Sequence, residues 1–349
     1  MKERDFIIVG QGLAGTLLAH FLKAAGKSVL LVDANTKHAA SKVAAGIINP
    51  VTGRRFVKSW MIESLLPFAK ATYRSIEAQL GCAIFHEKHI LRALANPKEE
   101  NDWLARATEA SYVPYLREKS EPENYSQYIR QPYAFGETLQ AAQVDIQTLI
   151  AAYRAFFLAN DELEEANFDY QLIDFQETKI HYKTWTAQAL VFCEGYGNAR
   201  NPFFQHLPIR GDKGQALIVH IPGANFQKLF KDQIFIVPLQ EADLYWVGAT
   251  YEPRFEHERP TEEGRDFLLK HLSDCLKLPF EVVEHKSAVR PTVKDRRPLL
   301  GQHSEFSNLY IFNGLGTKGA SLGPYWAQHM SDFLLGKTVL DPQVDIGRW

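Results

Sequence analysis

Three glycines near the N-terminus, Gly10, Gly12 and Gly15, have the spacing Gly-x-Gly-x-x-Gly. In such a turn the first glycine permits a tight bend and the second lets a pyrophosphate approach the backbone. The third lets a helix pack closely on a strand. No lysine lies in the turn, so backbone N–H groups and the positive helix end would hold the phosphates. The motif predicts a dinucleotide-binding turn, and Leu13 and Ala14, which open the helix, are expected to contact the cofactor with the three glycines.

The elements around this turn have the order that dinucleotide binding requires. The apolar run at 7–9 predicts a strand before it, and apolar side chains at helical spacing follow until Gly26. A second predicted strand, 28–32, ends at Asp33. That acid lies about 20 residues beyond the turn, where a carboxylate binds ribose hydroxyls. A glycine-rich turn without function is the simpler interpretation, and these flanking elements disfavour it.

A second group of small residues follows in the segment 41–47, Ser-Lys-Val-Ala-Ala-Gly-Ile. Ala44, Ala45 and Gly46, followed by Ile47, allow the backbone to approach a flat ring closely. The hydroxyl of Ser41 is able to donate a hydrogen bond to a phosphate. Composition alone leaves a second interpretation equally open, namely the start of an ordinary helix.

Composition limits the class of protein. The 349 residues are 46% hydrophobic, enough for a large core and for two domains. Lys plus Arg is 39 and Asp plus Glu is 41, so the net charge of −2 provides no general attraction for nucleic acid. Cys82, Cys193 and Cys275 show no metal-ligand spacing and favour a reducing compartment. No signal peptide or membrane span is visible, so we expect a soluble, cytoplasmic protein that binds no metal.

Longer elements are also predicted from the pattern. A helix is expected over about 60–80, another from Asp145 as N-cap, and a third from Thr261 as N-cap. The runs 234–238 and 245–250 predict a β-hairpin, and the run 170–175 predicts a strand. Residues 82–139 contain no motif with recognisable chemistry.

The N-terminal glycine turn, the acid after the second strand and the Ser-x-x-Ala-Ala-Gly-Ile segment resemble the D-amino-acid oxidase superfamily of flavoproteins. Its small bacterial members include glycine oxidase and sarcosine oxidase. In that family the Ala-Ala-Gly segment passes the isoalloxazine ring, so the resemblance implies FAD rather than NAD. Ala45 and Arg290 neighbour the places where a tethering Cys or His would stand, which implies non-covalent FAD.

The resemblance also assigns cofactor contacts in the centre of the chain. By position, Leu172 matches a valine whose backbone contacts adenine. The apolar run 188–192 leads into Cys193-Glu194-Gly195, which resembles the family's second strand-to-glycine crossing beside the FAD. Relatives usually carry Ala-Thr-Gly there, and Glu194 departs from this pattern. Its charge would be unfavourable near a pyrophosphate unless only its backbone faces the cofactor.

Near the C-terminus a predicted strand, 308–312, runs into a second glycine-rich turn. This turn resembles the family's C-terminal turn, which presents a helix N-terminus to the flavin pyrimidine. Backbone N–H groups, the helix dipole and a lysine would stabilise negative charge there. By this resemblance the lysine holds flavin, substrate or both, and we expect it to be catalytic. The expected residues are Gly314, Gly316, Thr317, Lys318 and Gly319.

Arg290 is the best candidate for substrate binding. The run from Arg290-Pro291 to Gly301 resembles a Leu-Arg-Pro segment of glycine oxidase, and the match aligns Arg290 with the arginine that binds the substrate carboxylate. A planar guanidinium suits this role because it makes two parallel hydrogen bonds to one carboxylate. A surface salt bridge is the alternative. Arg54, beside Arg55 and Lys58, is either solvated loop charge, which we favour slightly, or a second clamp for an anionic substrate.

The resemblance implies an α/β fold with two domains. A Rossmann-like FAD-binding domain with a parallel sheet would comprise 1-80, 140-205 and 286-349. A substrate-binding domain with a mainly antiparallel sheet and helices would comprise 81-139 and 206-285.

The activity implied by the resemblance is oxidation of the C–N bond of an amino acid or secondary amine by hydride transfer to flavin. The partners would be a small-molecule amine and an electron acceptor, either oxygen or another compound. Two alternatives remain open at this point. One is the flavin half of the transfer-RNA wobble-uridine modification enzyme, and the other is a non-catalytic flavin-binding protein. The sequence does not indicate the oligomeric state.

Overall fold

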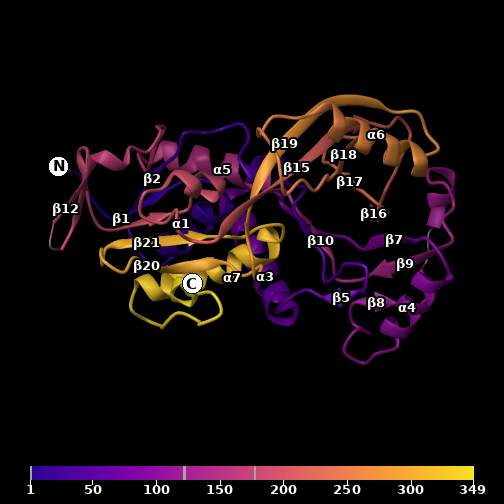
Figure 1. Cartoon of the computed structure of the whole chain (residues 1–349), viewed down its shortest axis with the longest axis horizontal. Helices are drawn as coiled ribbons and strands as arrows, with labels where there is room; N and C mark the ends of the chain where they lie inside the picture. The colour runs from indigo at the N-terminus through magenta and orange to yellow at the C-terminus, as the bar shows by residue number, and fades with distance from the viewer. Residues whose placement is uncertain (1, 121–122, 177) are drawn as a thin grey trace.

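The computed structural model describes residues 2–120, 123–176 and 178–349. Its first sheet has the strand order β11-β2-β1-β14-β13-β12, with β21 pairing with β14 and β20 with β21 (Figure 1). The pairs β11–β2, β2–β1, β1–β14 and β14–β21 are parallel. The strands are β1 Lys2–Val9, β2 Val29–Val32, β11 Leu163–Glu164, β12 Ile173–Phe175, β13 Ile180–Tyr182, β14 Trp185–Phe192, β20 Leu299–Gln302 and β21 Leu309–Asn313.

Both faces of this sheet are covered, which explains why β2 and the C-terminal halves of β1 and β14 are apolar and buried. One face packs on α1, α5 and α7, and on the other face sheet residues such as Phe192 form an aromatic-rich cluster with Phe204 and Leu207. Helix α7 lies directly on α1: a Cβ added to Gly323 would be 2.8 Å from Leu17. The helices are α1 Leu13–Ala24, α2 Ala40–Val43, α3 Ile62–Leu80, α4 Pro97–Ala107, α5 Ile146–Ala159, α6 Glu262–Cys275 and α7 Gly319–Leu334.

The second large sheet has the order β19-β15-β18-β17-β16-β7-β9-β8 and lies beside the first in Figure 1. All its pairs are antiparallel except β16–β7. Helix α6 covers one face over a core that includes Leu217, Leu268 and Leu272. The strands are β7 Ile90–Leu94, β8 Leu116–Arg117, β9 Ala134–Thr138, β15 Ile209–His220, β16 Leu229–Lys231, β17 Phe235–Pro238, β18 Leu244–Gly248 and β19 Glu281–Val293.

Short elements complete the fold. A three-stranded sheet consists of β3 Ile47–Ile48, β10 Ala142–Val144 and β6 Phe85–Glu87, and a hairpin joins β4 Val51–Thr52 to β5 Val57–Lys58. The 3-10 helices are η1 Glu123–Gln127, η2 Tyr170–Leu172, η3 Gly195–Arg200 and η4 Ile346–Arg348. Within the described residues, no helix combines the length and hydropathy needed to cross a bilayer.

The predicted fold class, an α/β protein with a parallel sheet and a mainly antiparallel sheet, is confirmed. Asp145 and Thr261 cap α5 and α6 as expected, accepting hydrogen bonds from Thr148 N and Gly264 N. The strand expected at 170–175 is wrong in its first half: residues 170–172 form η2, because the Asp169 side chain accepts from Gln171 N and holds a turn there. The division into two domains remains a proposal, and β19 runs through its boundary at 286.

Candidate functional site

The N-terminal glycine turn lies where β1 meets β14. Gly10 has φ +99°, and a Cβ there would be 2.6 Å from the carbonyl oxygen of Cys193. A Cβ on Gly15 would be 1.9 Å from Gly10 O. A side chain at either position would therefore push helix α1 away from the strands. The fold brings Cys193 and Gly195 beside the turn because β14 pairs with β1 in parallel.

The N-terminus of α1 is open to an anion. Its N-cap, Gly12, has no side chain and its first turn contains no acid. The Oγ of Ser41 accepts a hydrogen bond of 3.0 Å from Leu13 N, so its hydroxyl hydrogen is left to donate elsewhere. Ser41 thus lies beside the glycine turn, as expected for a phosphate site. A contact between Ser41 and phosphate remains a prediction.

Asp33 lies at the end of β2 in a network of hydrogen bonds. One carboxylate oxygen accepts from Gln11 N at 2.9 Å, and the other accepts from Asn35 N at 2.8 Å and Arg154 Nη1 at 3.0 Å. Arg154, from α5, also donates to Gln11 Oε1 at 2.8 Å. Sequence reasoning missed Arg154 because it lies 121 residues from Asp33 and belongs to no motif.

We expect Arg154→Gln to weaken FAD binding by about 10- to 150-fold, since hydrogen bonds to charged groups contribute about 1.5–3 kcal/mol. Titration of the apoprotein with FAD, followed by flavin fluorescence, measures the dissociation constant. Glu165→Gln is the matched control, because Glu165 pairs with the outer side of the same guanidinium and is 51% exposed. Equal losses in both variants would contradict a special role for the Asp33 contact.

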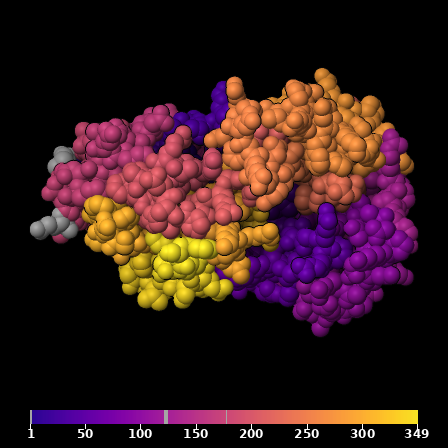
Figure 2. All heavy atoms as spheres, in the orientation of Figure 1, coloured from indigo at the N-terminus to yellow at the C-terminus, as the bar shows by residue number. Residues whose placement is uncertain are grey.

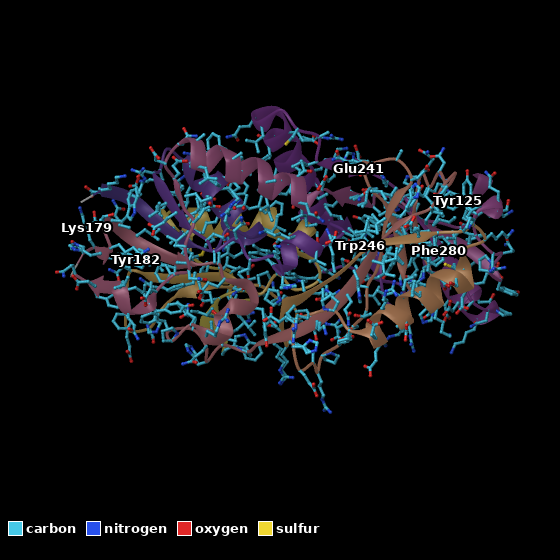
Figure 3. All side chains as sticks on the ribbon, turned by 90° about the horizontal axis from the view of Figure 1, so that it is seen from above. Tyr125, Lys179, Tyr182, Glu241, Trp246 and Phe280 are labelled. Atoms are coloured by element: carbon cyan, nitrogen blue, oxygen red, sulfur yellow. The ribbon has the colours of Figure 1, made fainter. Side chains whose placement is uncertain are left out.

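The segment after α2 is held between β10 of the three-stranded sheet and the second large sheet. Gly46 has φ +70°, and a Cβ there would be 1.8 Å from Val144 O. On the other side, Trp246 Nε1 donates to Val43 O at 2.9 Å. Ala45 and Ile47 pack against an apolar cluster of the second sheet that includes Trp246. Figure 3 shows Trp246 near the middle of the molecule, far from Tyr182 at the outer end of the first sheet.

The C-terminal glycine turn lies against the N-terminal one. Gly314 and Gly316 have φ +76° and +54°, and Gly316 N donates to Pro291 O at 3.1 Å. A Cβ on Gly319 would be 3.2 Å from Leu13, so the N-termini of α7 and α1 are adjacent. Thr317 is exposed. Close to Gly316, the hydroxyl of Thr292 is buried and has no hydrogen-bond partner among the described residues, which leaves a polar group for a ligand.

Lys318 is the N-cap residue of α7. Its Nζ donates to Ser59 Oγ at 3.0 Å. Burial lowers the pKa of Lys318, and the charges of Arg296 and Arg297 lower it further. The guanidinium of Arg297 lies 3.9 Å from the ring centroid of Trp60. The chain therefore holds a partly desolvated ammonium next to the start of this helix.

Arg290 lies on β19 opposite Asp212 of β15. Its guanidinium passes over Gly214, where a Cβ would be 2.0 Å from Nη2. Burial lowers the pKa of Arg290, while the charges of Asp212, Tyr251 and Glu252 act to raise it. An arginine remains protonated under these conditions. Gly214 and Ala216 share a face by strand alternation, and Ala216 belongs to the cluster that packs on Ala45.

Two predicted residues lie apart from this arrangement. Arg54 is exposed in the turn between β4 and β5, and it makes no hydrogen bond or ion pair with any other described residue. Leu172 is 47% exposed in η2, beside β12 at the far end of the first sheet (Figure 1). Among the residues that the structure describes, no hydrogen bond, ion pair or ring contact joins either residue to the glycine turns, and their roles remain predictions.

The departure at Glu194 is explained by its contacts. Its carboxylate accepts hydrogen bonds from the Tyr170 hydroxyl and from Asn201 Nδ2. Burial raises the pKa of Glu194, and these two hydrogen bonds act in the opposite direction. The side chain therefore turns away from Gly10, which removes the objection to an acid beside a pyrophosphate.

The described residues fit FAD. Two helix N-termini meet at glycine turns that a Cβ would fill, a carboxylate follows β2, and an unpaired hydroxyl lies near Gly316. Gly10 to Gly15 would hold the pyrophosphate, Asp33 the ribose, and residues 44–47 with Gly314 to Gly319 the flavin.

Fold and site together define a dinucleotide-binding α/β protein whose second sheet presents an arginine toward the cofactor segment. A family model described as "FAD dependent oxidoreductase" (DAO) matches residues 5–333, and the chain belongs to this family. The predicted resemblance, the FAD cofactor and the oxidoreductase class are thereby confirmed.

The chain is similar to several characterised relatives. It is 23% identical to glycine oxidase of Bacillus subtilis (strain 168), over 97% of this chain and 95% of that protein. The structure of glycine oxidase from Geobacillus kaustophilus superimposes with a TM-score of 0.81 at 22% identity, covering 97% of this chain and 96% of the other. The bifunctional transfer-RNA modification protein MnmC of Burkholderia mallei (strain SAVP1) is 26% identical over 86% of this chain, but only 48% of MnmC is covered.

Proposed function

We propose that this protein oxidises the C–N bond of an amino acid or secondary amine, with Arg290 binding the substrate carboxylate. One observation carries the assignment of the clamp. The Arg290 guanidinium lies over Gly214, on the sheet face that packs against Ala45 and Ile47. This face is where a substrate between the second sheet and the flavin segment would lie.

The chain's own residues supply binding and orientation. Bound FAD supplies the acceptor for the hydride from the carbon next to nitrogen. Arg290 fixes the carboxylate by two parallel hydrogen bonds, which orients that carbon. Lys318 and the first N–H groups of α7 place positive charge where negative charge develops. Trp246 and its apolar neighbours exclude water from one side.

The names of the relatives support an amino-acid substrate. They include glycine oxidases, an iminodiacetate oxidase from Chelativorans sp. BNC1 and an L-proline dehydrogenase from P. horikoshii. Each name refers to a small compound with a carboxylate and an amine. These relatives include both oxidases and a dehydrogenase. Oxygen is therefore our first candidate for the electron acceptor, and an acceptor other than oxygen is the alternative. A cytoplasmic location also remains a prediction, and all three cysteines are free thiols.

Anaerobic reduction of the bound flavin tests this function. We expect at least one amino acid or secondary amine to bleach the flavin absorbance, because the hydride then resides on the cofactor. Simple amines without a carboxylate serve as the control and should reduce it much more slowly. Oxygen consumption after mixing with air then separates an oxidase from a dehydrogenase. If no amine bleaches the flavin, the proposed oxidation is wrong, and a non-catalytic flavin-binding protein is favoured.

The transfer-RNA alternative has less support. The MnmC match covers about half of those proteins, and the net charge of −2 gives no overall attraction for RNA. This alternative would be supported if an anticodon stem-loop bound in a salt-sensitive way and if its modified base, but no free amine, reduced the flavin.

A further inference from the structure

The sheet face that presents Arg290 continues across four more strands to two further cations. Paired positions on neighbouring strands share a face, because side chains alternate along each strand. Ala216 belongs to the cluster that packs on Ala45, and Phe235 packs against it, so the row lies on the sheet face that contacts residues 44–47. The row consists of Ala216, Gly248, Phe235, Lys231 and Arg92.

Lys231 and Arg92 are adjacent and partly buried. The guanidinium of Arg92 lies 4.7 Å from the ring centroid of Phe56, and Lys231 Nζ lies 4.9 Å from that of Phe235. Lys231 Nζ donates to the carbonyl oxygen of Gln233 at 2.9 Å. Within residues 2–120, 123–176 and 178–349, neither cation forms an ion pair.

Two neighbouring cations of this kind are unfavourable by themselves. Burial lowers the pKa of Lys231 to about 8, the charge of Arg92 lowers it further, and Asp232 acts in the opposite direction. Burial also lowers the pKa of Arg92, against the charges of Glu99 and Asp232. An anion between the two groups would offset both the desolvation and the repulsion.

The spacing of strands sets the size of the ligand. Strands lie about 4.8 Å apart, so β16, which carries Lys231, is about 14 Å from β15. The Arg290 guanidinium lies over Gly214 of β15, so about 14 Å separates it from the strand that carries Lys231, and this distance exceeds the length of glycine. Figure 2 shows the surface hollowed between the orange segment, around β15 to β19, and the indigo segment below it.

We propose that Lys231 and Arg92 bind a second carboxylate of the substrate, so that the preferred substrates are amino acids or secondary amines with two carboxylates. The proposal rests on the proposed function, in which Arg290 binds the first carboxylate. It names a substrate class and two specificity-determining residues distant from the reacting carbon.

Dissociation constants of unreactive ligands test the proposal. Straight-chain dicarboxylates of four to seven carbons and monocarboxylates of equal length are titrated into the FAD-loaded protein, and the flavin absorbance change is followed. We expect the best dicarboxylate to bind about tenfold more tightly than its monocarboxylate. Lys231→Gln and Arg92→Gln should bring this ratio close to one and leave monocarboxylate binding unchanged. Lys270→Gln is the control, because Lys270 is 71% exposed and pairs only with Asp274 among the described residues.

The outcomes separate this proposal from the function on which it rests. A ratio near one in the unmodified protein, or a ratio unchanged in Lys231→Gln, overturns the second carboxylate site. If monocarboxylates still bind and Arg290→Lys weakens them, the proposed function stands regardless. If no carboxylate binds and only an anticodon stem-loop perturbs the flavin, both fail. Lys231→Gln keeps the test valid if loss of the Phe56 contact unfolds Arg92→Gln.

Discussion

Arg290→Gln is expected to lower the affinity for a carboxylate substrate by about 30- to 4,000-fold. This range corresponds to about 2–5 kcal/mol, the loss when one partner of a desolvated charge pair is removed. Burial gives the Arg290 guanidinium few competing water contacts, so the substrate carboxylate would lose its main counter-charge. The measurement is kcat/KM for the best amino acid, together with the Kd of an unreactive carboxylate.

Two controls distinguish a clamp from a structural ion pair. Arg290→Lys keeps the charge opposite Asp212, which is 5% exposed, and removes only the planar fork. It should therefore fold normally and bind carboxylates with intermediate affinity. Arg74→Gln, which removes an exposed arginine paired with Glu77, should have no effect. If Arg290→Lys and the unmodified protein bind carboxylates equally well, the clamp assignment fails.

Gly214→Ala is expected to reduce kcat/KM by about 100-fold while the protein remains folded. The added methyl group would lie 2.0 Å from Arg290 Nη2 and 2.4 Å from Cζ, so the guanidinium must move. These atoms are the end of a flexible side chain, which makes the change inexpensive for the fold. A displacement of about 1 Å at a positioning group costs about 10²-fold in rate. Steady-state kinetics and thermal unfolding measure the two effects separately.

Gly197→Ala is the matched control for this substitution, because a Cβ there meets only Glu194 at an ordinary 3.5 Å. In a double-mutant cycle, Gly214→Ala should have little further effect in an Arg290→Gln background, since both act on one guanidinium. Additive losses would show that Gly214 serves another purpose.

These expectations place the selection of substrate in the second sheet. The glycine turns at Gly10 and Gly314 would hold the cofactor by backbone groups, which leaves few side chains there to distinguish substrates. Arg290 lies on β19, Lys231 on β16 and Arg92 on β7, so three strands of one sheet would determine which carboxylates bind. Changes along these strands would alter the preferred substrate while the flavin site stays the same.

Local patterns in the sequence determined the cofactor end of the site. The turn at Gly10 and the acid at Asp33 depend on steric access and on a short, fixed separation along the chain, so their spacing alone predicts their geometry. The caps at Asp145 and Thr261 are local in the same sense, because the side chain bonds to a backbone N–H three residues away.

Tertiary structure alone decided which distant groups meet. Arg154 reaches Asp33 only because α5 packs beside the first sheet, and Glu194 turns to Tyr170 and Asn201 only after β14 and η2 have come together. The register of β19 against β15 brings Arg290 over Gly214, and the pairing of β16 with β7 places Lys231 beside Arg92. Strand register depends on the whole sheet, so no local spacing in the sequence could reveal these pairs.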